Sequence, residues 1–372
     1  MAHAGFTASD HHWMARALRL AERGSMTARP NPRVGCVLVR DGALVGEGWH
    51  ARTGDAHAEV NALAAAGDAA RGASAFVNLE PCSHHGRTPP CVDALIAAGV
   101  AEVVVAMRDP NPAVAGRGLE RLRANGVAVR EGVLASEAEA LNAGFSRRML
   151  QGRPWVRCKL AASLDGRTAM ASGESRWITG AAARADVHRW RARSCAIVTG
   201  SGTVLSDDPA LTVRDIPDAA SVPPPLRVVL DRRLATPPQA RLLREPGATW
   251  LMTDQPETPA RSALERAGAR IEAVRGDDAG LDLDAVLARL AQHGINEVLV
   301  EAGATLAGAF LAAGLVDELI VYQAPHFMGH AGQPLVRLPG LDTMARRQSL
   351  EWLDMRCVGD DLRLMARPAP PA

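Results

Sequence analysis

The chain has 372 residues, of which 47% are hydrophobic, and this content excludes intrinsic disorder for most of its length. Its 42 basic and 41 acidic residues give a net charge of +1, which argues against a nucleic-acid-binding surface, normally strongly basic. Apolar runs of the roughly 18 residues that a membrane span needs are absent, and the first residues lack the basic and apolar regions of a secretory signal, so we expect a cytoplasmic protein without membrane contact.

Helices and strands are expected to alternate through the first 150 residues. Asp10 is the expected cap of a first helix that ends at Gly24, and Asp41-Gly42 predicts a tight hairpin between two strands within 34–50. Later helices are expected at 57–70, 90–100, 118–126 and 136–150, and later strands at 75–81, 103–107 and 127–133. This alternation predicts an α/β layer fold.

The segment QGRPW at 151–155 is the expected domain boundary, because a second α/β series follows it. Its expected strands are 155–163, 195–202, 226–231, 249–253, 270–274, 296–303 and 318–325, and its expected helices are 179–194, 262–269, 281–294 and 303–315. We therefore expect domains at 1–150 and 151–366, with a disordered tail at 367–372.

Six cysteines in a cytosolic chain of this size do not indicate a disulfide framework. Four lie in apolar, strand-like text and are expected to be buried as small hydrophobic residues: Cys36, Cys158, Cys195 and Cys357. The other two, Cys82 and Cys91, lie in loop text rich in Gly, Pro and His.

His57, Glu59, Cys82 and Cys91 follow the H-x-E…P-C…C arrangement of zinc-dependent deaminases. One imidazole and two thiolates give Zn²⁺ three ligands and leave the fourth position for water, whose pKa the metal lowers toward about 7. Glu59 would not be a ligand; it would carry the proton from that water to the leaving ammonia. A structural zinc site without turnover is the alternative, and Glu59 argues against it because a structural site does not need a proton carrier.

Eight residues separate the two cysteines, where deaminases commonly have two. With this insertion, the segments PNPRVGCVLVRDG, HAEVNAL, LEPCSHHGRTPPC and DPNPAVAGRG resemble the bifunctional deaminase/reductase family of riboflavin biosynthesis. The second half agrees in KLAASLDGRTAMASGESRWITG, GSGTVLSDDPALTVR and VEAGATLAGAFL, so the resemblance covers about residues 10–365. It implies a cytidine-deaminase-like three-layer domain followed by a dihydrofolate-reductase-like domain.

For the first domain the resemblance implies hydrolytic deamination of a diaminopyrimidinone that carries a ribosylamino 5-phosphate. The residues expected to bind this phosphorylated substrate are Asn31, His50, His84, Arg87, Asp109 and Asn111. Turn formation explains Asn31, Asp109 and Asn111 equally well, because Asn-Pro and Asp-Pro are turn formers.

A Rossmann fingerprint follows none of the expected strands in either half. The segments 303–308 and 200–203 are instead the candidate phosphate-binding turns, because small residues let a phosphate approach backbone N–H groups. Close packing of a helix on a sheet is the alternative for both.

For the second domain the resemblance implies NADPH-dependent reduction of the ribosyl group, in its open-chain form, to ribityl. The expected cofactor contacts are Ala161, Trp177, Thr203, Asp207, Arg232, Gly303, Ala304, Thr305, Leu306, Ala307, Gly308 and Ala309. The expected substrate contacts are Ser175, Arg191, Leu211, Arg214 and Glu301, and the two arginines suit a phosphate. Without the resemblance, Arg191 would be interpreted as part of a solvated helix face.

Lys159 is the single lysine among 42 basic residues, the rest being arginine. A compact ammonium enters a narrow pocket that a planar guanidinium does not, so we expect Lys159 to be catalytic. The resemblance implies that Lys159 lies beside the substrate sugar, with Asp207, also expected to be catalytic, and Glu301 nearby. Chance survival of one codon is the alternative.

Two alternatives stay open for the whole chain: a second domain that only binds a nucleotide or regulates, and a deaminase acting on nucleic acid, which the charge balance disfavours. The protein is also expected to be a homo-oligomer, either a dimer or a tetramer.

Overall fold

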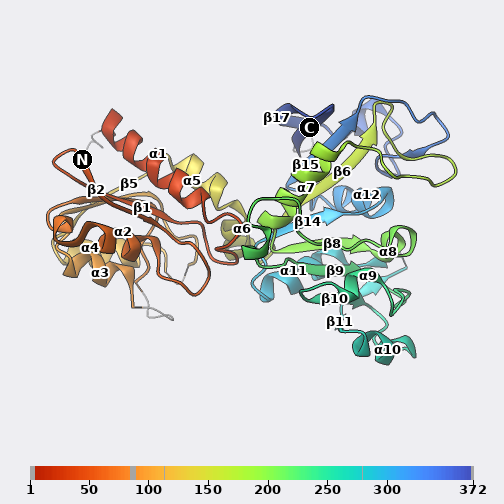
Figure 1. Ribbon diagram of the computed structural model, residues 1–372, viewed down its shortest axis with the longest axis horizontal. Helices are drawn as coiled ribbons and strands as arrows, with labels where there is room; N and C mark the ends of the chain where they lie inside the picture. The colour runs from red at the N-terminus through yellow and green to blue at the C-terminus, as the bar shows by residue number, and fades with distance from the viewer. Residues whose placement is uncertain (1–4, 84–88, 113, 279, 370–372) are drawn as a thin grey trace. The chain divides into compact units, whose positions relative to one another are not determined.

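A computed structural model describes residues 5–83, 89–112, 114–278 and 280–369. The chain divides into two compact units, 1–152 and 153–372, each with its own sheet (Figure 1). The division falls within two residues of the expected boundary.

Unit 1 is built on a five-stranded sheet in the order β2-β1-β3-β4-β5. Its elements are α1 (Ala8–Glu22), β1 (Gly35–Arg40), β2 (Ala43–Trp49), α2 (Ala58–Ala66), η1 (Gly67–Ala70), β3 (Ser74–Leu79), α3 (Cys91–Ala97), β4 (Glu102–Met107), α4 (Arg117–Ala124), β5 (Ala128–Glu131), α5 (Ala135–Leu141) and α6 (Ala143–Gln151). The expected hairpin is confirmed: β1 and β2 pair antiparallel around Asp41 and Gly42, both at positive φ. β3, β4 and β5 are parallel.

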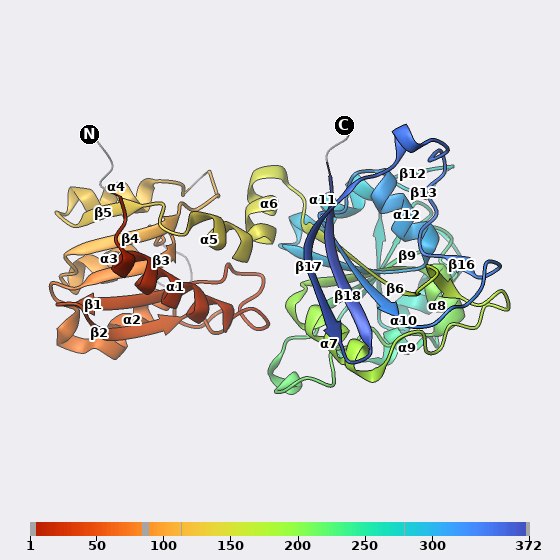
Figure 2. The ribbon, with the colours of Figure 1, turned by 90° about the horizontal axis from the view of Figure 1, so that it is seen from above.

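Both faces of this sheet are covered, which makes three layers (Figures 1 and 2). Alternate residues of β1 serve the two faces: Cys36 and Leu38 pack with α2, α3 and α4, while Val37 and Val39 pack with α1 and α5. A strand buried on both faces is hydrophobic along its buried part, as β1 is from Cys36 to Val39. The three-layer α/β arrangement expected from the resemblance is thus present.

Close contact between β2 and α2 fixes the start of α2. A Cβ at Gly46 would lie 2.4 Å from the Ala62 carbonyl oxygen, and a Cβ at Gly48 would lie 2.6 Å from the Ala62 nitrogen. Glycine at both positions therefore lets α2 lie directly on the hairpin, and this places His57 and Glu59 at the edge of the sheet.

Two expectations for unit 1 helices are wrong. Thr7, not Asp10, caps α1: its hydroxyl accepts from the Asp10 N–H, and Asp10 closes the capping box from the third helical position. The helix expected at 136–150 is broken at Asn142, which ends α5 and begins α6. The buried Asn142 amide instead bonds to both backbone groups of Arg33, a contact that periodicity does not reveal.

Unit 2 is built on a nine-stranded sheet in the order β11-β10-β9-β8-β14-β6-β15-β18-β17, in which the first seven strands are parallel and β18 is antiparallel to both of its neighbours. Its strands are β6 (Trp155–Ser163), β7 (Arg167–Ala169), β8 (Ala196–Gly200), β9 (Leu226–Leu230), β10 (Thr249–Thr253), β11 (Ala269–Ala273), β12 (Gly276–Asp277), β13 (Gly280–Leu281), β14 (Glu297–Glu301), β15 (Glu318–Ala324), β16 (Gln333–Pro334), β17 (Leu350–Val358) and β18 (Asp361–Pro368). Its helices are α7 (Ala181–Arg193), α8 (Ser201–Asp207), η2 (Ala219–Ser221), α9 (Arg241–Arg244), α10 (Ala260–Arg266), α11 (Leu283–Gln292), α12 (Ala304–Ala312) and η3 (Met344–Arg346).

The helices of unit 2 cover the two faces of its sheet. α11 and α12 pack on one face through the largest core cluster, which includes Leu287 and Phe310. α7 packs on the other face, where Trp190 contacts residues of β14 and β15. Because β6, β8, β9 and β14 are parallel, their carboxyl ends lie at the same side of the sheet. Open α/β sheets bind ligands at this position.

The C-terminal part of the chain departs from expectation. The tail expected to be disordered at 367–372 is wrong for its first residues: Arg367 and Pro368 end β18 and pair with β17 (Figure 2). Residues 370–372 lie outside the described part. Cys357, expected to be buried, is exposed on β17, which is an edge strand, whereas the other three cysteines of that group are buried.

Within the described residues, no helix is long and apolar enough to cross a membrane.

Candidate active sites

Three predicted ligands meet at one edge of the unit 1 sheet. His57 is the N-cap residue of α2, Cys91 is the first residue of α3, and Cys82 lies in the loop between β3 and α3. The His57 Nδ1 atom is 3.2 Å from the Cys91 sulfur and 3.6 Å from the Cys82 sulfur, and the three donor atoms lie within 4.8 Å of one another. Ligands of a tetrahedral zinc ion, at bond lengths of about 2.0–2.3 Å, show similar separations.

The two thiols cannot both ionise easily without a cation. The hydrogen bond from Cys91 lowers the pKa of Cys82 to about 4, and the same interaction, with burial, raises the pKa of Cys91. A dication in contact with both sulfurs would stabilise both thiolates, so this donor set fits zinc.

Glu59 lies on the first turn of α2, next to these ligands, and is 3% exposed. Burial raises the pKa of Glu59 to about 7, with a smaller contribution from Cys82. A carboxyl group of this kind can both accept and release a proton near neutral pH.

Two of the expected substrate-binding residues are brought to this site. The His50 ring packs edge-on against the His57 ring, with centroids 5.4 Å apart. The Asn31 amide donates to His50 Nε2 at 3.0 Å, so the proton of His50 resides on Nδ1, which faces the Ala56 carbonyl at 3.2 Å. Turn formation therefore does not fully account for Asn31, because its side chain also binds His50 at the site.

Asp109 and Asn111 form the turn that was the alternative interpretation: the Asp109 carboxylate accepts from the Asn111 N–H at 2.8 Å. They lie at the same sheet edge as Cys82, because Leu79 and Met107 are in register at the ends of β3 and β4. The expected contacts His84 and Arg87 lie outside the described residues.

Glu80 is a residue that the sequence analysis missed. Its buried carboxylate accepts from the N–H groups of Asp109 at 3.2 Å, Gly116 at 2.9 Å and Gly118 at 2.9 Å. It therefore ties the loop after β4 to the segment that carries Cys82. No sequence signal predicts this role, since its three donors lie about 30 to 40 residues away.

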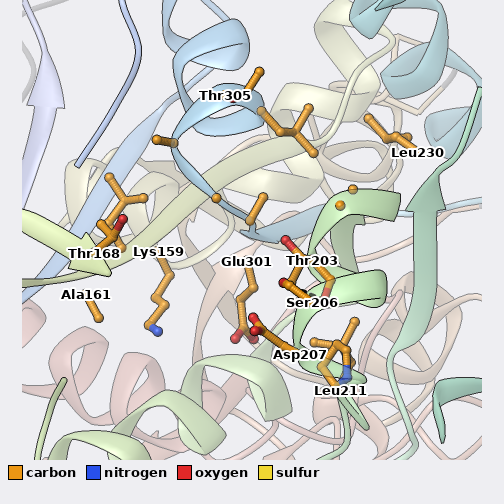
Figure 3. A pocket seen from close by; sticks show the side chains of 18 of the residues that line it. Lys159, Ala161, Thr168, Thr203, Ser206, Asp207, Leu211, Leu230, Glu301 and Thr305 are labelled. Atoms are coloured by element: carbon orange, nitrogen blue, oxygen red, sulfur yellow. Dashed lines mark hydrogen bonds between the residues drawn. The ribbon is translucent and has the colours of Figure 1, made fainter. Parts of the chain in front are cut away.

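The second candidate site is a cavity of about 1510 Å³ within unit 2 (Figure 3). This volume exceeds the roughly 300–1,000 Å³ of a pocket for one small ligand, so it has room for a dinucleotide and a substrate. The expected residues that line it are Lys159, Ala161, Ser175, Trp177, Arg191, Thr203, Asp207, Leu211, Arg214, Arg232, Glu301, Gly303, Ala304, Thr305, Leu306 and Ala309.

Two expected cofactor contacts do not line this cavity. Ala307 is fully buried in the core beneath α12. A Cβ at Gly308 would lie 2.0 Å from the Arg337 carbonyl oxygen, so Gly308 serves close packing. Close packing of the helix, the alternative interpretation of this segment, therefore applies to Ala307 and Gly308, which do not line the cavity.

The N-terminus of α12 lines the cavity and is a candidate anion-binding site. Gly303 is the N-cap residue, none of the described side chains caps the helix, and a Cβ at Gly303 would meet nothing within 4 Å. The first N–H groups of α12 are therefore available to a phosphate group. The segment 200–203 also lines the cavity, but it is the beginning of α8 rather than an isolated turn.

Lys159 and Glu301 are register neighbours on the parallel strands β6 and β14, and their side chains point the same way into the cavity (Figure 3). Burial lowers the pKa of Lys159, while Glu301 opposes this shift. Asp207, at the end of α8, lines the same cavity (Figure 3).

Arg191 and Glu301, both expected to bind substrate, bind each other. The Arg191 guanidinium donates to both Glu301 oxygens, at 2.6 and 2.8 Å, and a third hydrogen bond reaches the Thr212 carbonyl at 3.1 Å. The interpretation of Arg191 as part of a solvated helix face is wrong, because only 13% of its side chain is exposed. Arg214, half of whose side chain is exposed, is the freer cation for a phosphate.

Comparisons with known proteins agree with both units. The sequence model for the cytidine and deoxycytidylate deaminase zinc-binding region matches residues 7–107, and that for the RibD C-terminal domain matches residues 154–362. The riboflavin biosynthesis protein RibD of Escherichia coli K12 is 52% identical over 364 residues, covering 95% of this chain and 98% of its own.

Solved structures show the same similarity. Acinetobacter baumannii RibD (form 1) is 45% identical, with a TM-score of 0.92, and the match covers 97% of this chain and 99% of that one. A diaminohydroxyphosphoribosylaminopyrimidine deaminase/5-amino-6-(5-phosphoribosylamino)uracil reductase from Thermotoga maritima is 33% identical, with a TM-score of 0.85 and the same coverage. Sequence, fold and both sites therefore show that the chain belongs to the RibD family of bifunctional riboflavin biosynthesis enzymes, with a deaminase and a reductase domain.

Proposed function

We propose that the two units catalyse consecutive steps on one phosphorylated pyrimidine: hydrolysis of an amino group of 2,5-diamino-6-(5-phosphoribosylamino)pyrimidin-4-one, then reduction of the ribosyl group to ribityl. The observation that carries the proposal is the presence of both intact sites on one chain, His57, Cys82 and Cys91 with Glu59 in unit 1, and Lys159 with Glu301 in unit 2.

In unit 1, His57, Cys82 and Cys91 would hold zinc, and Glu59 would move the proton. Zinc, when bound, supplies Lewis acidity that lowers the pKa of a water molecule. Glu59 takes a proton from the attacking water and delivers it to the nitrogen that leaves as ammonia, while Asn31 and His50 orient the pyrimidine edge.

In unit 2, the cavity wall at Gly303 and the α12 N-terminus would hold the cofactor phosphates. NADPH, when bound, supplies the hydride. Lys159 donates a hydrogen bond to the ribose oxygens and so orients and polarises the sugar during hydride transfer, and the Arg191–Glu301 pair holds the cavity wall beside it.

One incubation tests the proposal. Purified protein is given the diaminopyrimidinone substrate with and without NADPH, and the products are identified by mass. We expect the amino-to-carbonyl product without NADPH and the ribityl product with it. Deaminated product alone in both samples would indicate a second unit that only binds or regulates, and unchanged substrate would indicate a zinc scaffold without turnover.

Removal of one zinc ligand should empty the metal site. Cys91→Ser replaces a thiolate by a hydroxyl, a poor zinc ligand, so we expect about one zinc ion per chain in the wild type and little in the variant. Cys195→Ser, in unit 2, is the matched control and should keep its zinc. Elemental analysis that finds unchanged zinc in Cys91→Ser would refute the ligand assignment.

NADPH should be preferred over NADH. Arg232, Arg241 and Arg337 line the cavity, and a guanidinium binds a phosphate more strongly than a hydroxyl. We expect kcat/KM for reduction to be at least about tenfold higher with NADPH, which corresponds to about 1.4 kcal/mol. Equal kcat/KM for the two cofactors would contradict this expectation.

We propose that the enzyme works in the cytoplasm, because a site with two zinc-binding thiolates needs reduced cysteines. The homo-oligomer stays a prediction. The edge strand β17 exposes large apolar side chains, among them Trp352 and Met355, as an interface between copies would require.

A further inference from the structure

His188 lines the unit 2 cavity and has no role in the function described above. It lies on α7, one turn before Arg191, and is 4% exposed. A buried histidine in the wall of a ligand cavity has its ring nitrogens committed to nearby partners, and these partners indicate what it does.

The partners of His188 lie in one loop, residues 211–215. Its Nδ1 atom is 3.3 Å from the backbone N–H of Arg214 and 3.1 Å from the carbonyl of Thr212. Its Nε2 atom is 3.7 Å from the Asp215 carboxylate.

Two observations assign the tautomer. The Arg214 N–H donates to Nδ1 at 3.3 Å, which requires Nδ1 without a proton, and Nε2 faces the negative charge of Asp215. The ring proton therefore belongs on Nε2, and Nδ1 accepts from the Arg214 N–H. Burial, with the positive charges of Arg191 and Arg214, lowers the pKa of His188 to about 4, so the ring is neutral near pH 7.

The conformation of the loop at residues 211–215 depends on its hydrogen bonds with α7. Residues 209–214 have no regular secondary structure, and Leu211 and Asp215 have φ of 50° and 57°, in the left-handed region that non-glycine residues rarely adopt. His188 and Arg191 from α7 hold its backbone at Arg214 and Thr212. Arg191 is itself held by Glu301, so the loop is tied to the floor of the cavity.

Arg214 is the residue of this loop that we expect to bind a phosphate in the cavity. Its side chain is 51% exposed, and its polar contacts with described residues include long ones, 3.4 Å to Asp215 and 3.4 Å to the Thr212 hydroxyl. Its guanidinium is therefore able to turn toward a phosphate, provided that its backbone stays in place.

We propose that His188 is a positioning residue of the reductase site: by accepting the Arg214 N–H, it fixes the backbone from which Arg214 binds the phosphate of the substrate. His188 acts through Arg214 and does not contact the reacting atoms. The inference rests on the proposed function, since it needs the second unit to bind a phosphorylated sugar.

Three substitutions at one position test this inference. Asn places its side-chain oxygen near the position of Nδ1, Gln reaches toward the position of Nε2, and Ala supplies no acceptor. We expect His188→Ala to raise KM for the deaminated intermediate about tenfold, or about 1.4 kcal/mol, with kcat within about twofold of the wild type. His188→Asn should recover most of this loss, and His188→Gln should resemble His188→Ala.

A phosphate-free intermediate is the second measurement. Since the effect passes through the phosphate, wild type and His188→Ala should have similar kcat/KM for the dephosphorylated compound. Adding His188→Ala to Arg214→Ala should also raise KM little further, because the two residues act as a unit. Deamination by unit 1 and KM for NADPH should not change, and each serves as an internal control for folding.

Several results would overturn the inference: an unchanged KM in His188→Ala, an equal loss with the phosphate-free compound, or no recovery in His188→Asn when its thermal unfolding matches that of the wild type. Failure of the wild type to reduce the intermediate would instead refute the proposed function, so the two failures are distinguishable.

Discussion

Glu59→Gln should abolish deamination while both the zinc and the reductase remain. Glutamine keeps the size of the side chain and its ability to form hydrogen bonds, but it cannot carry a proton from water to the leaving nitrogen. General acid–base groups contribute about 10²–10⁴ in rate, so we expect a fall in kcat of this size. Rates of ammonia release by the wild type and the variant measure it.

Zinc content and reduction of supplied intermediate are the controls for this variant. Glu59 is buried next to His57 but is not among the three clustered donors, so zinc should stay bound. Reduction should be nearly normal, because the described residues that line the cavity of unit 2 all belong to that unit. Loss of zinc in Glu59→Gln would show that Glu59 is a ligand and that its assigned role is wrong.

Lys159→Arg should slow reduction by at least about tenfold, equivalent to about 1.4 kcal/mol of transition-state stabilisation, although the charge is kept. Lys159 is a half-buried residue between Glu301 on β14 and Ile320 on β15, and a planar guanidinium is wider than an ammonium. Lys159→Met removes the donor altogether, and we expect a loss of about 10²–10³ in kcat, as for other groups that stabilise developing charge.

Single-turnover reduction with saturating NADPH measures both variants, and deamination by the same preparations is the control. Wild-type reduction in Lys159→Arg would show that the single lysine is an accident of codon usage. A loss in Lys159→Arg as large as in Lys159→Met would show that shape, rather than charge, decides the function of this position.

The metal site illustrates what local sequence predicts well. His57, Glu59, Cys82 and Cys91 are positioned by the ends of neighbouring elements, and the sequence shows these ends through helix-starting and strand-ending residues. The hairpin at Asp41-Gly42 and most helices and strands follow from equally local signals, and the three-layer fold follows from the resemblance of such segments to a known family.

Other features depend on partners far away in the chain. Asn142 breaks a helix because it binds Arg33, 109 residues earlier, and Arg191 is buried because Glu301, 110 residues later, neutralises it. Periodicity along α5, α6 and α7 contains no information about these contacts, and the interpretation of Arg191 as part of a solvated helix face is therefore wrong.

By itself, the sequence predicted the candidate zinc ligands, the candidate proton carrier, the two-domain order and a role for the single lysine, because each prediction depends on residue type and short spacing. Only the tertiary structure decided that Ala307 and Gly308 face away from the cavity and that Glu80 and His188 hold the loops around the two sites. The physical reason is that a buried polar group must find hydrogen-bond partners, and the folded chain supplies them from segments that are not adjacent in sequence.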